Sequence, residues 1–165
     1  MPVIRRLTAA DAEELTALRV RNRTTISEYE PDWDDPEAYY TVDGVRAWIV
    51  DGNERFAILD GEQIAGMISL TGIVYGALCT AMIGYFVDAE RHGRGLATAA
   101  IGEIAGYGFR ELGLHRLEAG TAVDNLASQR VLEKNRFTRV GLLRAHLRIR
   151  GEWVDHYLWE RIVGD

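Results

Sequence analysis

The sequence predicts an α/β fold with a mixed sheet, and three observations support this prediction. Segments with strand-like alternation are interleaved with segments whose apolar residues recur at helical spacing. Asp60-Gly61, a strong short hairpin signal, divides the apolar segment 55–76 into two strands. With 165 residues, of which 47% are hydrophobic, the chain is expected to form one domain, 1–165, with a substantial core.

The N-terminal part of the chain is expected to hold one strand and two helices. A short strand is expected over 3–9, followed by a helix over 9–22 whose apolar residues fall on one face and whose N-cap is Thr8 or Asp11. A segment rich in acidic and aromatic residues follows, with two of the three prolines, and is expected to be a loop. The second helix is expected over 36–51.

Strands and helices alternate through the rest of the chain. Gly113 marks a helix end, because glycine accepts the left-handed conformation that closes many helices, and Asp124 or Asn125 can cap the helix that follows. In chain order, the expected elements are a hairpin over 55–76, a strand over 79–88, a helix over 96–113, a strand over 115–123, a helix over 124–135, and two strands over 137–149 and 153–162.

Composition and charge argue against several classes of protein. The formal net charge of -6 disfavours a general nucleic-acid binder, which needs a basic surface. The single cysteine, Cys79, cannot form an internal disulfide and has no adjacent histidine or charge that would activate it. His115 and His156 lack metal-ligand spacing, so no metal is expected. The sequence shows no membrane-length apolar stretch and no signal-like start, which predicts a cytoplasmic protein.

The segment RHGRGLAT, residues 91–98, leads from an apolar strand into a helix. Gly93 and Gly95 let the backbone approach a ligand, two arginines add positive charge, and the start of the helix presents free N–H groups. These features are typical of a phosphate site, and a turn that only connects two elements is the alternative. The segment is not a P-loop, and Thr98 stands where the dinucleotide fingerprint needs Gly or Ala.

Two stretches resemble one enzyme family. His92-Gly93-Arg94-Gly95-Leu96-Ala97 resembles the acetyl-CoA-binding motif of the GNAT acetyltransferases, Gln/Arg-x-x-Gly-x-Gly/Ala. HRLEAGTAVDNLASQRVLEKNRF (115–137) resembles their Rim-type branch, the ribosomal-protein N-acetyltransferases, and the resemblance runs from about Ile83 to Trp159. It implies the GNAT fold: a central mixed, mostly antiparallel sheet of about seven strands, splayed in the middle, with about four helices.

The resemblance implies an N-acetyltransferase that moves an acetyl group from acetyl-CoA to a primary amine, such as the N-terminus of a protein or peptide. The amine would attack directly, through a tetrahedral intermediate and without a metal. Two alternatives stay open. The acceptor could be a small amine (a polyamine, an amino acid or an antibiotic), or the chain could be a CoA-binding sensor without catalysis. No nucleic-acid or membrane partner is expected, and the dimers common in the family leave a homodimer open.

The resemblance also places CoA on this sequence. The pyrophosphate would lie on the glycine turn, and the pantetheine arm between the preceding strand and the start of the later helix. The implied CoA-binding residues are Phe86, Val87, His92, Gly93, Arg94, Gly95, Leu96, Ala97, Thr98, Asn125 and Ser128. His92 replaces the usual Gln or Arg, which matters little if the contact is made by the backbone. Arg136 replaces a family glycine, and Asn135 is the residue expected to take a positive φ there.

Three side chains are candidates for catalysis. Other branches of the family use a tyrosine as general acid at the position of Leu132, so here Ser128 would hydrogen-bond the departing sulfur instead. The alternative is that the Ser128 hydroxyl bonds the backbone of its own helix. Glu118 would be the general base, or would form an ion pair with Arg116 on the same strand face. His146 is a second candidate base, unless it shares a solvated strand face with neighbouring arginines. A reaction without a side-chain base, through a water path, is the remaining option.

The acidic and aromatic segment near the N-terminus borders the acceptor site in the resembling family. Glu28, Tyr29 and Trp33 are therefore expected to contact the amine substrate. Acidic side chains there would attract a cationic amine, and an exposed acidic loop without such a role is the alternative.

Overall fold

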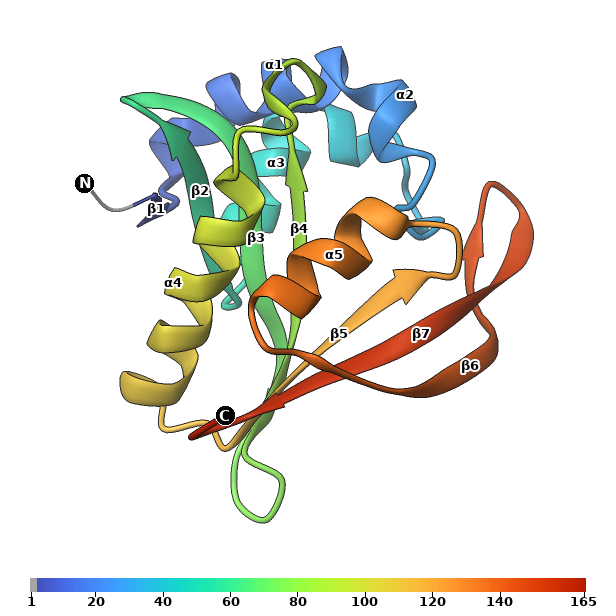
Figure 1. The fold of residues 1–165 in the computed structure, drawn as a ribbon. Helices are drawn as coiled ribbons and strands as arrows, with labels where there is room; N and C mark the ends of the chain where they lie inside the picture. The colour runs from blue at the N-terminus through green and yellow to red at the C-terminus, as the bar shows by residue number, and fades with distance from the viewer. Residues whose placement is uncertain (1–2) are drawn as a thin grey trace.

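The computed structural model describes residues 3–165, in which helices cover both faces of a seven-stranded sheet (Figure 1). The strands are β1 (Ile4–Arg6), β2 (Glu54–Asp60), β3 (Gln63–Val74), β4 (Thr80–Val87), β5 (Arg116–Ala122), β6 (Thr138–Ile149) and β7 (Glu152–Ile162). The helices are α1 (Ala12–Arg21), α2 (Arg23–Ile26), α3 (Val42–Ile49), α4 (Leu96–Arg110) and α5 (Leu126–Lys134), with 3-10 turns at Ala9–Asp11, Ala38–Tyr40 and Ala89–Arg91. The predicted α/β class, the mixed sheet and the four longer helices are confirmed. The short α2 lies in the segment that was expected to be loop.

The strand order in the sheet is β1-β2-β3-β4-β5-β7-β6. Neighbouring strands are antiparallel except β4 and β5, which run parallel and pair only between Thr80–Ile83 and Arg116–Ala119. Beyond these residues the two strands diverge (Figure 1). The splay expected in the middle of the sheet is therefore present, and it leaves the facing edge of residues 84–87 without a neighbouring strand.

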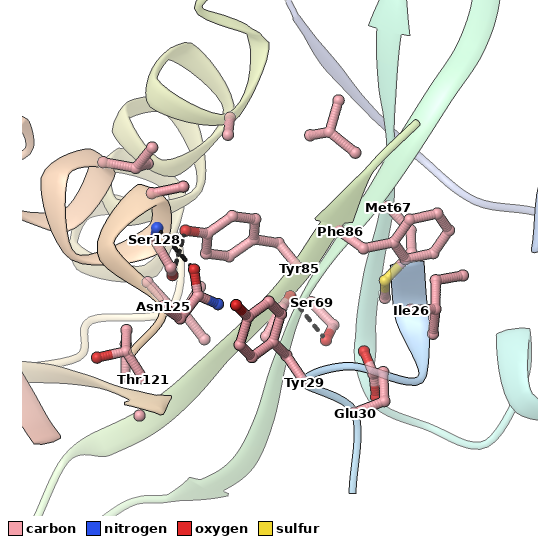
Figure 2. Close-up of a pocket in the computed structure, with 18 of the residues that line it drawn as sticks. Ile26, Tyr29, Glu30, Met67, Ser69, Tyr85, Phe86, Thr121, Asn125 and Ser128 are labelled. Atoms are coloured by element: carbon pink, nitrogen blue, oxygen red, sulfur yellow. Dashed lines mark hydrogen bonds between the residues drawn. The ribbon is translucent and has the colours of Figure 1, made fainter. Parts of the chain in front are cut away.

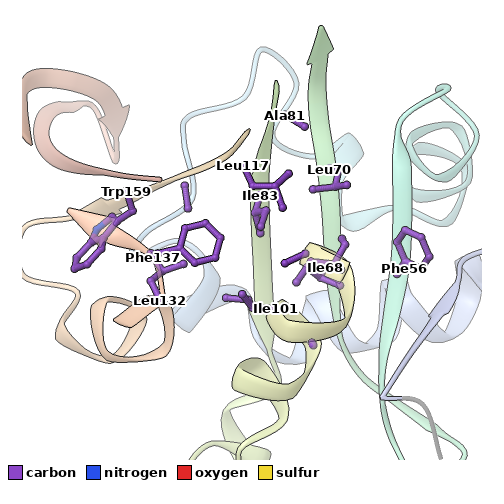
Figure 3. Close-up of a cluster of buried hydrophobic side chains, with 14 of the residues drawn as sticks. Phe56, Ile68, Leu70, Ala81, Ile83, Ile101, Leu117, Leu132, Phe137 and Trp159 are labelled. Atoms are coloured by element: carbon purple, nitrogen blue, oxygen red, sulfur yellow. The ribbon is translucent and has the colours of Figure 1, made fainter. Parts of the chain in front are cut away.

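Side chains alternate between the two faces of the central strands. On β3, Ile68 and Leu70 pack under α4 with Ile101 (Figure 3). Met67 packs on the opposite face with residues of α1 and α3. Leu132 of α5 belongs to the first of these clusters. The central strands are thus covered on both sides, and the splay lies between the α4–α5 layer and the α1–α3 layer.

The turn after α5 corrects one expectation. Asn135 has a φ of -97°, and Arg136 takes the positive φ, at 63°. The side-chain amide of Asn135 donates to the carbonyl oxygens of Thr98 and Val131, both at 3.0 Å, which fixes Asn135 at the end of the helix. The chain must then reverse at the next residue, so Arg136 takes the left-handed conformation at a cost of about 1–2 kcal/mol.

Candidate active site

A cleft opens where β4 and β5 separate, and its volume is about 1120 Å³. Its walls are residues 84–87 of β4, residues 119–122 of β5, the start of α5, the glycine turn before α4, and the segment after α2 (Figure 2). The volume exceeds the range of about 300–1000 Å³ that is usual for a site holding one small ligand. The cleft can therefore hold a long donor and an acceptor together.

The glycine turn forms one end of the cleft. Gly93 and Gly95 have φ values of 76° and 80°, and no atom lies within 4 Å of the position that a Cβ would take at either residue. Among the described residues, the backbone N–H groups of 93–98 have no hydrogen-bond partner. They stand at the start of α4, where the helix dipole adds partial positive charge. The turn therefore has the geometry of an anion site.

Charged side chains surround this anion site. Arg91 and Arg94 both reach Asp60, at 2.8 and 2.5 Å, where the β2–β3 hairpin turns. Arg91 also lies 3.7 Å from Asp88, which pairs with Arg21. Three guanidinium groups thus share two carboxylates, so a positive charge remains for a ligand. Arg130 and Lys134 of α5 also line the cleft, although the sequence analysis did not single them out.

Both the backbone N–H and the ring of His92 contact backbone carbonyl oxygens of neighbouring residues. Its backbone N–H donates to the carbonyl oxygen of Ala89 at 3.3 Å, and its Nε2 lies 2.9 Å from the carbonyl oxygen of Val87. The N–H groups that face a ligand are therefore those of the residues after His92.

Ser128 lies on the opposite wall from β4 and contacts a tyrosine that the sequence analysis missed. Its Oγ is 2.7 Å from the hydroxyl oxygen of Tyr85, and its backbone N–H donates to Oδ1 of Asn125 at 3.1 Å (Figure 2). Asn125, rather than Asp124, thus caps α5. Burial raises the pKa of Tyr85 to about 12, against a smaller opposing effect of the Ser128 hydrogen bond, so the phenol keeps its proton at neutral pH. Strand alternation over 81–87 was the available signal for Tyr85, which shares a face with Ile83.

Glu118 does not line the cleft. It lies opposite Met82, where β4 and β5 are still paired, and its carboxylate accepts a hydrogen bond from Nε of Arg116 at 2.7 Å. Arg116 also reaches the carboxylate of Glu160 at 2.5 Å. The contacts of Glu118 are those of the ion pair that the sequence analysis offered as the alternative to a catalytic base.

Replacing Glu118 with Gln is expected to affect stability and not turnover. Losing a partly exposed ion pair worth roughly 0.5–1 kcal/mol should lower the melting temperature by about 1–3 °C. The turnover number per folded molecule should stay within about two-fold of the parent at every pH. Calorimetry and steady-state kinetics measure both, with Glu160→Gln as the matched control on the same arginine. A large fall in turnover at an unchanged melting temperature would show that Glu118 is the base.

His146, for which the sequence left open a role as base or a place on a solvated strand face, is exposed and lines the far end of the cleft. The pairing of β6 with β7 is interrupted between Leu143 and Leu147, and Ala145 has a φ of 46°. Its N–H donates to Asp155 at 2.7 Å, which fixes this irregularity. The His146 ring lies edge-on to the His156 ring, with 5.6 Å between centroids, and burial together with His156 lowers the pKa of His146.

The segment after α2 forms the acceptor end of the cleft. Glu28, Tyr29 and Trp33 all line it, and the Trp33 ring stacks on Tyr39 at 5.9 Å. Asp32 holds this segment against the β6–β7 turn by accepting hydrogen bonds from backbone N–H groups of that turn, at 2.7 and 2.9 Å. Both walls of the acceptor end are therefore tied together.

Glu30 lines the same end, and the sequence analysis did not single it out. Burial raises its pKa to about 7, against an opposing effect of the Arg19 charge. Nothing in the residue pattern around Glu30 indicates that it faces inward, while its neighbours Glu28 and Tyr29 are more exposed.

Three further observations concern the described residues. Residues 3–165 contain no group of three or more His, Cys, Asp or Glu side chains placed to hold a metal ion. Cys79 lies outside the cleft, at the turn before β4. Within the same residues, no helix combines the length and apolar character needed to cross a membrane.

Comparison with known proteins identifies what the chain resembles as a whole. The model of the acetyltransferase (GNAT) domain family matches residues 3–138. YjcK of Bacillus subtilis (strain 168), a probable N-acetyltransferase, is 40% identical over 163 residues, covering 93% of this chain and 89% of that protein.

Two solved structures have the same fold. Ribosomal-protein-S5-alanine acetyltransferase from Vibrio fischeri superposes with a TM-score of 0.91 at 26% identity, covering 98% of this chain and 93% of that one. RimJ of Mycobacterium smegmatis, solved in complex with CoA-disulfide, superposes with a TM-score of 0.88 at 30% identity, covering 97% of this chain and 81% of that one.

Proposed function

This chain belongs to the GNAT acetyltransferase family as an acetyl-CoA-dependent N-acetyltransferase, and from that membership we propose that its acceptor is the N-terminal amine of a peptide or protein. One observation carries the proposal: the rim of the acceptor end is made of large aromatic side chains that remain accessible, with Tyr29 38% and Trp33 46% exposed. Residues that follow an N-terminal amine would pack on such a rim, whereas a small amine would need only the interior. The S5-alanine acetyltransferase of Vibrio fischeri, named for a protein substrate, supports this acceptor class.

The donor is proposed to occupy the other end of the cleft. The pyrophosphate of acetyl-CoA would accept hydrogen bonds from the N–H groups of 93–98. The pantetheine amides would pair with the open edge of β4 near Phe86 and Val87, in the way an added strand pairs with a sheet edge. Asn125 and Ser128 would close the arm from the α5 side.

The acyl carbon would then lie in the splay. A backbone N–H of the open β4 edge would stabilise the tetrahedral oxyanion, because the strand holds it in place before the reaction begins. Tyr85 and Ser128, hydrogen-bonded to each other, would give a proton to the departing thiolate.

A panel of acceptors tests the proposal. Peptides with a free N-terminus, the same peptides with a blocked N-terminus and one free lysine, and free polyamines and amino acids are each incubated with acetyl-CoA, and CoA release and product mass are measured. The peptides with a free N-terminus are expected to react with a kcat/KM at least about ten-fold higher than the others, a difference of about 1.4 kcal/mol in transition-state binding. Turnover of small amines alone would contradict the peptide acceptor, and CoA binding without any turnover would indicate a sensor.

A further inference from the structure

We propose that Glu30 is the general base of this acetyl transfer, taking the proton from the acceptor amine. The inference rests on the N-acetyl transfer described above but not on which amine is the acceptor. The other carboxylates of the cleft do not meet this need, because Glu28 lies at its exposed edge and Asp51 is paired with Arg55. Glu118 lies outside the cleft.

The position of Glu30 relative to the sheet supports this role. Strand alternation directs Tyr85 toward α5 and Ser128, whereas Met67 and Phe86 face the α1–α3 layer. Figure 2 draws Glu30 beside Ser69, on the Met67 side of the cleft, whereas Ser128 lies on the opposite side. A base on one face of the splay and a proton donor on the other suit an amine that enters from one side while a thiolate leaves from the other.

The Glu30 carboxylate is available for this proton. In the described part of the chain, no donor lies within hydrogen-bond distance of its oxygens, and no cation pairs with it. A half-buried carboxylate that lines a cleft and accepts no hydrogen bond binds protons more readily than a fully exposed one. Its environment therefore favours proton uptake, with a pKa of about 7, near the optimum for a base that works at neutral pH.

A buried arginine keeps this carboxylate partly ionised. Arg19 is fully buried between the rings of Tyr39 and Trp48, whose centroids lie 3.8 and 4.1 Å from its guanidinium carbon. It donates to the carbonyl oxygen of Tyr39 at 3.3 Å, while its Nε and Nη2 have no partner among the described residues. Its charge favours the ionised form of Glu30, while Tyr39 and Tyr40 are the other titratable groups that face Glu30.

The proton balance of the step is as follows. The acceptor ammonium gives one proton to the Glu30 carboxylate, and the resulting neutral amine attacks the acetyl carbonyl carbon to form the C–N bond. The C–S bond then breaks, the nitrogen loses a second proton, and the CoA thiolate takes one proton. The products are the acetamide, CoA and one proton released to solvent through Glu30.

Kinetics of Glu30→Gln test the proposal. Asp34→Asn is the control for loss of one negative charge, because Asp34 lies on the exposed part of the same segment. Glu30→Gln should lower kcat about 100-fold, while the KM for acetyl-CoA stays within about two-fold. Asp34→Asn should leave kcat unchanged, and Glu30→Asp should restore part of it. The melting temperature of Glu30→Gln at pH 8 should not fall, because the substitution removes an ionised carboxylate from a poorly solvated place.

The pH profile separates a base from a group that only attracts a cation. For the parent, kcat/KM should rise through pH 7, because the ionised carboxylate is the active form, and this limb should keep its position when an acceptor of different amine pKa is used. In Glu30→Gln, the rise of kcat/KM through pH 7 should disappear, and only the rise set by the pKa of the acceptor amine should remain. An unchanged kcat with an intact limb, or a rise in amine KM alone, would overturn the proposal. A parent enzyme that acetylates only small amines would refute the peptide acceptor and leave this test in place.

Discussion

Gly95→Asp is expected to remove measurable CoA binding. Gly95 stands at the start of α4 with a φ of 80°, among free N–H groups of the cleft. An aspartate there would place a negative charge where the pyrophosphate is proposed to lie. Two like charges about 4 Å apart repel by roughly 4 kcal/mol near a protein surface, which is close to three orders of magnitude in Kd. Isothermal titration with CoA measures the effect.

Two further variants separate charge from backbone strain. Gly95→Ala keeps the unfavourable positive φ without the charge, and is expected to weaken binding less than Gly95→Asp does. Gly113→Asp introduces the same side chain at a φ of 64° beyond the other end of α4, outside the cleft, and should leave CoA affinity unchanged. Equal CoA affinity of Gly95→Asp and the parent would show that the pyrophosphate lies elsewhere.

Ser128→Ala is expected to lower turnover by about 10- to 100-fold with little change in the KM of the amine. The reason is the 2.7 Å contact between its hydroxyl and that of Tyr85, through which a proton would pass to the sulfur in the proposed donor position. Tyr85→Phe should have a similar effect, because it breaks the same path. Since the pKa of Tyr85 is raised to about 12, the turnover of the parent should not decline from its ionisation below about pH 10.

The double variant Ser128→Ala/Tyr85→Phe decides whether the two hydroxyls act together. If they form one path, removing both should cost little more than removing either, so the effects should be strongly non-additive. Additive effects would show two separate roles. Unchanged turnover in Ser128→Ala would show that Ser128 has only a structural role at the N-terminus of α5, where its backbone N–H donates to Asn125.

The proposed donor end of the cleft could be predicted from the sequence because the proposed contacts are made by the backbone. A backbone anion site needs residues that accept a positive φ at a helix start, and glycine is the residue that does so without strain. Gly93 and Gly95 therefore leave a visible pattern. The splay followed from the family resemblance, and the short parallel pairing of β4 with β5 confirms it.

The acceptor end could be predicted only in outline. How deeply a side chain reaches into the cleft, and where a strand is interrupted, leave no pattern in a single sequence. Glu28 and Glu30 are the same residue type two positions apart, and only the path of the chain makes one of them inward-facing. His146 reaches the cleft through an interruption of β6, where the N–H of Ala145 donates to Asp155, ten positions further along the chain. Arg136 takes a conformation that its residue type disfavours, because the side chain of Asn135 is already committed to α4 and α5.

The place of β7 in the sheet has a consequence for the order in which the two ends of the cleft can assemble during synthesis. β6 precedes β7 in the chain, yet β7 lies between β6 and β5, so β6 cannot join the sheet until β7 has been made. The turn that Asp32 holds lies between these strands, 118 and 119 positions further along. A chain leaving the ribosome therefore carries every residue of the proposed donor end before the β6–β7 turn, one wall of the acceptor end, has been made. Contacts between residues so far apart in the chain also form slowly. The nascent enzyme would present a surface for CoA while it still lacks a complete place for an amine.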